Sequence, residues 1–147
     1  ILLGASLFNS LYRAVGAQQL IINLVSDLGW GPWTVLILMM ISLFFLGMLM
    51  DDFAVVMLCT PLYVPIIKAF GFNSLWFAML FMVNMQMAYL TPPYGFNLFY
   101  MKSITPDNIT MGDIYRSVLP FVGLQLIALI LVMIFPQLAL WLPSLLK

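Results

Sequence analysis

The chain has 147 residues, of which 65% are hydrophobic and only 7% are charged. A soluble domain is about half apolar and about a quarter charged, so this composition is typical of an integral membrane protein. The segments described below predict that it is all-α. Five acidic residues balance five basic ones, and this balance argues against a nucleic-acid partner. All the acidic residues are aspartates, and the sequence contains no histidine.

Residues 1–31 predict two short helical segments. Residues 1–12 are apolar and lack a basic start, so we expect the end of a membrane-spanning helix in a longer protein and not a signal peptide. Residues 17–28 place Leu20, Leu24 and Leu28 on one face and polar side chains on the other. This pattern indicates an amphipathic helix, which either lies in the membrane interface or packs on other protein.

Two uncharged runs follow, residues 32–50 and 53–67, separated by Asp51 and Asp52. The second run would reach only about 22 Å, less than the hydrocarbon thickness of a bilayer. Two interpretations stay open at this point. Either two spanning helices meet at the aspartates in an aqueous turn, or residues 32–68 form a re-entrant hairpin whose tip is buried in protein. Cys59 lies in the second run and is expected to be a buried free thiol.

The apolar segment 75–101 is interrupted by the sequence TPPYG. Pro92 and Pro93 have no amide hydrogen, so the carbonyls of Ala88 and Tyr89 lose their helical donors. Gly95 can then begin a second helix in a new direction. Because an unpaired carbonyl is costly in hydrocarbon, the break either lines a site or is a kink whose carbonyls find other donors.

Such a break offers oxygen ligands to a cation. Free carbonyls and the Thr91 hydroxyl suit a sodium ion at the negative end of the first half-helix. The second half-helix would present its positive end, near Tyr94 to Asn97, to an anion. A polar loop at 102–113 then leads to a final spanning helix at 117–146, which bends or ends near Pro136 and Pro143.

These two regions together resemble the C-terminal part of the large membrane subunit of tripartite ATP-independent periplasmic (TRAP) transporters. The family has a Gly-x-x-x-Asp hairpin tip, followed by Asn and then by Thr-Pro-Pro-x-Gly-x-Asn-Leu. In this chain the motif positions are Gly47, Asp51, Asn84, Thr91, Pro92, Pro93, Gly95, Asn97 and Leu98. Two positions depart from the family pattern, because Asp52 stands where proline is frequent and Ala88 where glycine is common.

The resemblance implies the second of two inverted repeats, with a re-entrant hairpin and a discontinuous transmembrane helix. Residues 1–31 would be a helix end plus an arm helix, 32–116 the transport domain and 117–147 the final helix. The sodium ligands would be the carbonyls of three residues and the side chain of a fourth: Gly47, Ala88 and Tyr94, with Thr91. Candidate residues on the solute side are Asp51, Asn84, Pro92, Pro93, Gly95 and Asn97.

The resemblance also implies sodium-coupled uptake of a small organic acid by an elevator movement. The partners would be a periplasmic solute-binding protein and a small membrane subunit, in the bilayer of the bacterial inner membrane. A passive channel or a structural subunit is the alternative. An intramembrane protease is not expected, because the adjacent Asp51 and Asp52 cannot converge from different helices. Their expected role is to cap the second limb of the hairpin.

Overall fold

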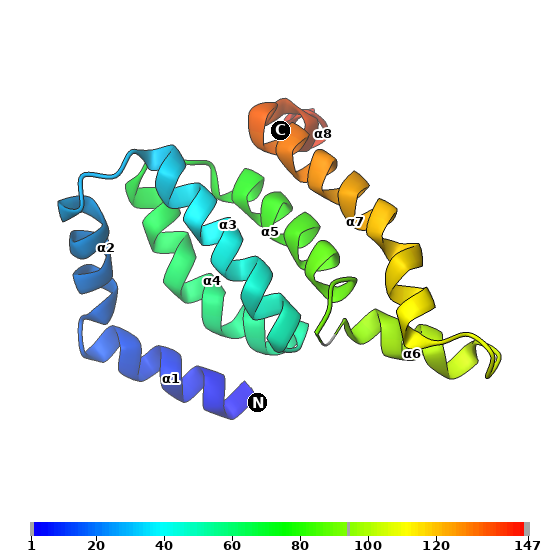
Figure 1. The fold of residues 1–147 in the computed structure, drawn as a ribbon. Helices are drawn as coiled ribbons and strands as arrows, with labels where there is room; N and C mark the ends of the chain where they lie inside the picture. Colours follow the sequence, from blue (N-terminus) through cyan, green and yellow to red (C-terminus); the bar gives the residue numbers. More distant parts are fainter. Residues whose placement is uncertain (1, 94, 146–147) are drawn as a thin grey trace.

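The computed structural model describes residues 2–93 and 95–145, and within them all regular structure is helical, as expected (Figure 1). The helices are α1 (Leu2–Ala14), α2 (Ala17–Asp27), α3 (Pro32–Leu49), α4 (Asp52–Ala69), α5 (Ser74–Tyr89), α6 (Phe96–Ile104), α7 (Met111–Ile134) and α8 (Gln137–Ser144). Three of these described helices, α3, α4 and α7, are long and apolar enough to cross a membrane.

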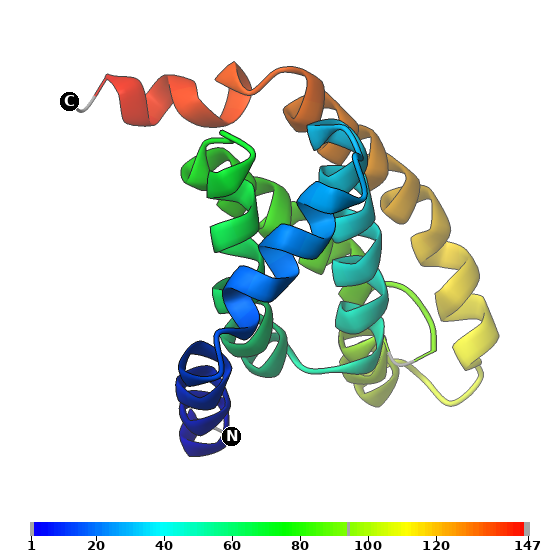
Figure 2. The same ribbon diagram turned by 90° about the vertical axis from the view of Figure 1, so that its left-hand side faces the viewer.

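Helices α3 and α4 form the helical hairpin predicted for residues 32–68. Each has 18 residues and is therefore about 27 Å long. The second limb is longer than the uncharged run, because Asp51 caps the helix and Asp52 already belongs to its first turn. Helix α5 lies beside both limbs and runs toward the hairpin tip (Figures 1 and 2).

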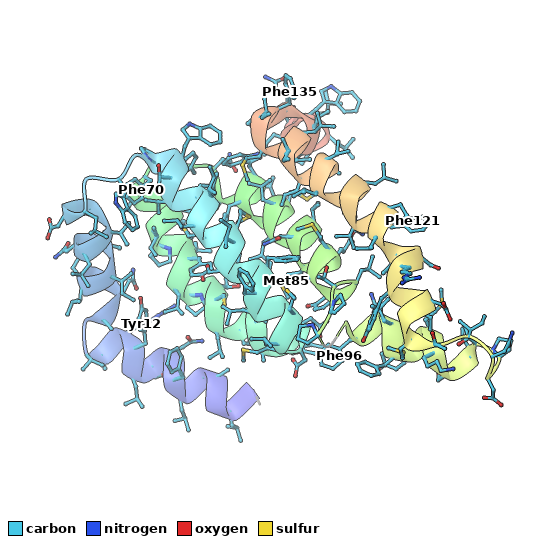
Figure 3. All side chains as sticks on the ribbon, viewed as in Figure 1. Tyr12, Phe70, Met85, Phe96, Phe121 and Phe135 are labelled. Atoms are coloured by element: carbon cyan, nitrogen blue, oxygen red, sulfur yellow. The ribbon has the colours of Figure 1, made fainter. Side chains whose placement is uncertain are left out.

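The core lies where α3 and α5 pack against each other. Leu36, Leu43 and Leu80 are completely buried there. Met85 of α5, labelled in Figure 3, belongs to the same core. On α4, Cys59 is buried and free, as the sequence predicted. The hairpin and α5 therefore make one packed unit, and its apolar side chains interlock from three helices.

The final long helix begins earlier than the sequence analysis expected. Helix α7 starts at Met111 and not at 117, because Thr110 and Asp113 form a reciprocal capping box that fixes its first turn. It ends before Pro136, as predicted, and α8 follows, with Pro143 in its last turn. With 24 residues, α7 is about 36 Å long.

The amphipathic helix forms as α2, with almost the predicted bounds. Its apolar face is divided between two directions. Ile21, Ile22 and Val25 pack against the core, whereas Leu20, Leu24 and Leu28 are more than half exposed. Packing on protein therefore accounts for only part of the apolar face.

Candidate ion and solute site

The helix interruption occurs where the prolines predicted it. Helix α5 ends at Tyr89, and α6 begins only after Gly95. One expectation is wrong, because the Ala88 carbonyl is not left without a donor. The Thr91 amide donates to it over 3.0 Å. The last turn tightens into an i to i+3 pattern, which replaces the amide that Pro92 lacks.

The Thr91 side chain closes the same turn. Its hydroxyl donates to the carbonyl of Met87 over 2.8 Å. Because the hydroxyl hydrogen is used in this bond, the lone pairs of the oxygen are directed elsewhere and can accept a cation. Pro92 and Pro93 follow and are both exposed.

Gly95 starts α6 in a backbone conformation that favours glycine. Its φ angle is 48°, in the left-handed region. A Cβ atom at this position would lie 2.9 Å from Leu98 Cδ1 and 3.4 Å from the Thr91 carbonyl oxygen. Gly95 therefore lets the chain turn tightly over the end of α5 before α6 begins.

The hairpin touches the break through the predicted sodium-site residues Gly47 and Ala88. Both are buried, and a Cβ atom built on Gly47 would lie only 2.8 Å from the Cβ of Ala88. Met85 Sδ would lie 3.0 Å from the same built atom. The backbones of α3 and α5 thus approach closely at this point, which a small residue on each helix permits.

The carbonyl of Gly47 also fits the predicted role. Helix α3 ends at Leu49, and the Met50 amide donates to the Leu46 carbonyl over 2.8 Å. The next residue, Asp51, has extended backbone angles and supplies no helical amide. Within residues 2–93 and 95–145, the Gly47 carbonyl receives no hydrogen bond. It is a neutral oxygen next to the end of α5.

Of the two aspartates that were predicted to cap α4, Asp51 does so. The carboxylate of Asp51 accepts a hydrogen bond from the Ala54 amide over 2.8 Å, and Asp52 lies in the first turn of α4. Both also line a cavity of about 350 Å³ between the hairpin tip and the broken helix. Its other described lining residues are Tyr89, Phe96, Asn97 and Tyr100.

Sequence reasoning found Asp51 and Asn97 but missed the aromatic wall of this cavity. Phe96 and Tyr100 are four residues apart in α6, so both lie on the same face of that helix (Figure 3 labels Phe96). Helical spacing counted from the break could have identified Tyr100. Tyr94, the remaining predicted sodium ligand, lies outside the described residues.

Asn84 lies one turn before Ala88 and is 1% exposed. Its side-chain amide donates to the carbonyl of Met40 over 2.7 Å, which links α5 to α3. Asn84 is not among the residues that line the cavity at the hairpin tip. In this structure its amide joins the two helices, and its contact with a solute stays a prediction.

Two hydrogen bonds show where the break between α5 and α6 lies along the length of α7. At one end, Trp76 in the first turn of α5 donates its Nε1 hydrogen to the Val132 carbonyl over 2.7 Å. At the other end, Lys102 in α6 donates to the carbonyl of Ile109 just before α7, also over 2.7 Å. The start of α5 and the end of α6 therefore lie near opposite ends of α7, and the break lies toward the end of α7 that is close to α6 (Figures 1 and 2).

These features define a multi-pass α-helical membrane protein with a discontinuous helix, an arrangement that recurs in secondary transporters. A family model described as "Tripartite ATP-independent periplasmic transporter, DctM component" matches residues 1–138. The chain belongs to this family, as the sequence motifs indicated.

Named relatives agree with this membership. The chain is 31% identical, over 98% of its length, to the C4-dicarboxylate TRAP transporter large permease protein DctM of Pseudomonas aeruginosa. It is 35% identical, over 78% of its length, to the sialic acid TRAP transporter permease protein SiaT of Haemophilus influenzae. The aligned region covers 33% of the first relative and 18% of the second, so the chain spans a third or less of their lengths. These relatives are named as permeases and not as enzymes, in agreement with the expectation that this chain is not an enzyme.

Proposed function

We propose that this chain is the C-terminal part of the large membrane subunit of a sodium-coupled transporter in the bacterial inner membrane. The solute would be a small organic acid. Family membership supports this proposal, as do the names of two relatives, which refer to C4-dicarboxylate and sialic acid. The single observation that carries it is the contact between the hairpin tip and the broken helix at Gly47 and Ala88.

The proposed sodium site uses neutral oxygens. It consists of the Gly47 and Ala88 carbonyls and the Thr91 hydroxyl, with the Tyr94 carbonyl as a fourth ligand outside the described residues. Among the described residues, no group of three or more His, Cys, Asp or Glu side chains is placed to hold a metal ion. Neutral oxygens at the negative end of a half-helix favour a monovalent cation.

We propose that the hairpin is re-entrant. The hairpin tip contacts the broken helix at Gly47 and Ala88, and this contact supports a tip that is buried in protein. Inside the hydrocarbon region, backbone without helical hydrogen bonds is tolerated only where it lines a site or a cavity. This arrangement supports the second inverted repeat of the family fold. Residues 32–116 would move as the transport domain, with 1–31 and 117–147 at its edges.

The solute would bind at the cavity next to the hairpin tip. Asp51 and Asp52 repel a carboxylate, so an organic acid would approach the positive N-terminal end of α6 at Gly95 and Asn97. Pro92 and Pro93 shape this approach by separating the two half-helices. Asn84 would reach the solute only if α3 and α5 move apart. Positive side chains would come from the other repeat, since no basic residue is among the described lining residues.

The proposed partners follow from the tripartite family description. A periplasmic solute-binding protein would deliver the organic acid, and a small membrane subunit would pack against the large one. The exposed apolar side chains of α7, including Leu124, Ile127 and Ile130, are available for lipid or for such a subunit.

The test is solute uptake by the complete membrane complex in proteoliposomes, with its binding protein outside. Labelled succinate and sialic acid are suitable solutes, because relatives are named for these classes. The proposal predicts accumulation above the external concentration only when a sodium gradient is imposed. Equilibration without accumulation, independent of sodium, would support the passive-channel alternative.

A further inference from the structure

A second and larger cavity lies along α4, away from the broken helix. Its volume is about 690 Å³. Apolar side chains of α4, including Val56, Met57 and Val64, form one wall. The opposite wall comes from the junction of α1 and α2, where Arg13 and Gln18 line it. Figure 2 shows α2 crossing in front of α4 on this side of the molecule.

Pro61 in α4 explains how this cavity is held open. Pro61 has no amide hydrogen, so the carbonyl of Met57 lacks its helical donor. The side-chain amide of Asn9 in α1 donates to that carbonyl over 3.1 Å. This bond attaches α1 to α4 and fixes the distance between the two walls. Both Pro61 and Asn9 line the cavity.

The cavity has an excess of positive charge. Arg13 and Lys68 both line it, and no acidic residue is among its described lining residues. Within residues 2–93 and 95–145, neither side chain forms an ion pair. Two unpaired cations facing one cavity, in a chain with only five basic residues, attract an anion.

The surroundings favour an anion that carries an apolar tail. Arg13 is in the last turn of α1 and Lys68 in the last turn of α4. Basic residues at the ends of apolar helices direct their charges toward the lipid headgroups. Along α4 the wall continues into exposed apolar side chains, Val56 at 42% and Phe53 at 66%. A water-soluble anion would gain nothing from such a wall, whereas an acyl chain would bury it.

We propose that this cavity binds the headgroup of an anionic phospholipid. Arg13 and Lys68 contact the phosphate, and the apolar wall of α4 contacts an acyl chain. Basic pockets between membrane helices bind anionic headgroups in this way. The lipid holds the α1–α2 junction against the hairpin. The proposal does not depend on sodium coupling at the broken helix.

The experiment measures phosphatidylglycerol retained by the purified complete complex, using native mass spectrometry, with phosphatidylcholine as the reference lipid. The double variant Arg13→Gln/Lys68→Gln is expected to retain roughly tenfold less phosphatidylglycerol, because charge-assisted contacts to the phosphate are lost. Arg116→Gln is the matched control, since this residue lies on α7 and does not line the cavity. Arg13→Lys/Lys68→Arg keeps both charges and is expected to retain the lipid.

Thermal unfolding distinguishes the possible occupants. Phosphatidylglycerol should raise the midpoint for the wild type and Arg116→Gln, but not for the double Gln variant. Equal stabilisation of the wild type by inorganic phosphate would overturn the lipid assignment in favour of a free anion. Unchanged lipid retention in the double Gln variant would also overturn it. If the double Gln variant retains the lipid normally but unfolds at a lower temperature in phosphatidylcholine, Arg13 and Lys68 pair with another part of the protein.

Discussion

Helices α5 and α7 are both strongly apolar, yet they have opposite surroundings. Eight residues of α5 are buried by other helices, whereas α7 buries only Ile114 and Leu129. Phe121 illustrates the difference, because it projects outward from α7 and is 59% exposed (Figure 3). In a membrane protein, apolar composition thus predicts contact with lipid or protein but does not distinguish them. Small and polar residues such as Ala88 and Asn84 mark the helix that faces protein.

The largest effect is expected for Gly47→Ala, which places a methyl group against Ala88 at the contact that α5 makes with the hairpin. The added atom would lie 2.8 Å from Ala88 Cβ, so α3 and α5 must separate. We expect destabilisation of about 1–3 kcal/mol and loss of most solute uptake. Adding Ala88→Gly removes the clashing atom and should restore part of both. A double-mutant cycle without coupling between the two changes would contradict the close contact.

A smaller effect is expected for Asn84→Leu, which removes the hydrogen bond from α5 to the Met40 carbonyl. The loss should be about 1 kcal/mol, measured by chemical unfolding of the complex in detergent micelles. Uptake per folded complex should stay near normal if Asn84 acts only by joining the helices. A strong loss of uptake without a loss of stability would instead indicate contact with the solute during transport.

The cap of α4 gives a similar but more local prediction. Asp51→Ala removes the hydrogen bond to the Ala54 amide and should cost about 1 kcal/mol. Asp51→Asn is the matched control, because asparagine caps equally well without the charge. Comparable uptake by Asp51→Asn and the wild type would assign the residue to capping. Failure of both variants would show that the negative charge itself is required.

The smallest effect is expected on α7. Leu124→Ala removes an exposed side chain that is not part of the core, so stability should change by no more than about 0.5 kcal/mol. The same unfolding assay measures this change. A loss as large as that of Gly47→Ala would mean that α7 packs on protein at this position, and the contrast with α5 would then be wrong.

The sequence predicted much of this fold because backbone chemistry is local. Pro92, Pro93 and Gly95 cannot continue a helix, so the position of the break was readable from three residues. The hairpin bounds followed equally from Pro32 and the two aspartates. The predicted start of α7 at residue 117 was wrong, because the charged residue Arg116 was used as the limit of the apolar segment. Thr110 and Asp113 form a capping box, which specifies an earlier helix start.

The site was predictable only in part. Gly47 and Ala88 are in contact although they are far apart in the chain. The sequence analysis placed both in one site because of the family motif and not because of their spacing. The Ala88 carbonyl was predicted to lack a donor, but the Thr91 amide reaches it, since a helix end can tighten by one residue. Helical spacing from the break could have identified Tyr100 on the same face as Phe96. The position of this aromatic wall beside the hairpin tip depends on how α6 turns after the break, which no local rule specifies.

The most direct test of the sodium site is the sodium dependence of uptake by the complete complex with three residues at position 91. Thr91→Ser keeps the hydroxyl oxygen, and Thr91→Val keeps the shape but removes it. The account predicts near-normal half-saturation by sodium for serine and at least a tenfold higher value for valine, the factor that corresponds to about 1.4 kcal/mol. Equal sodium dependence of the valine variant and the wild type would contradict a sodium site at the broken helix.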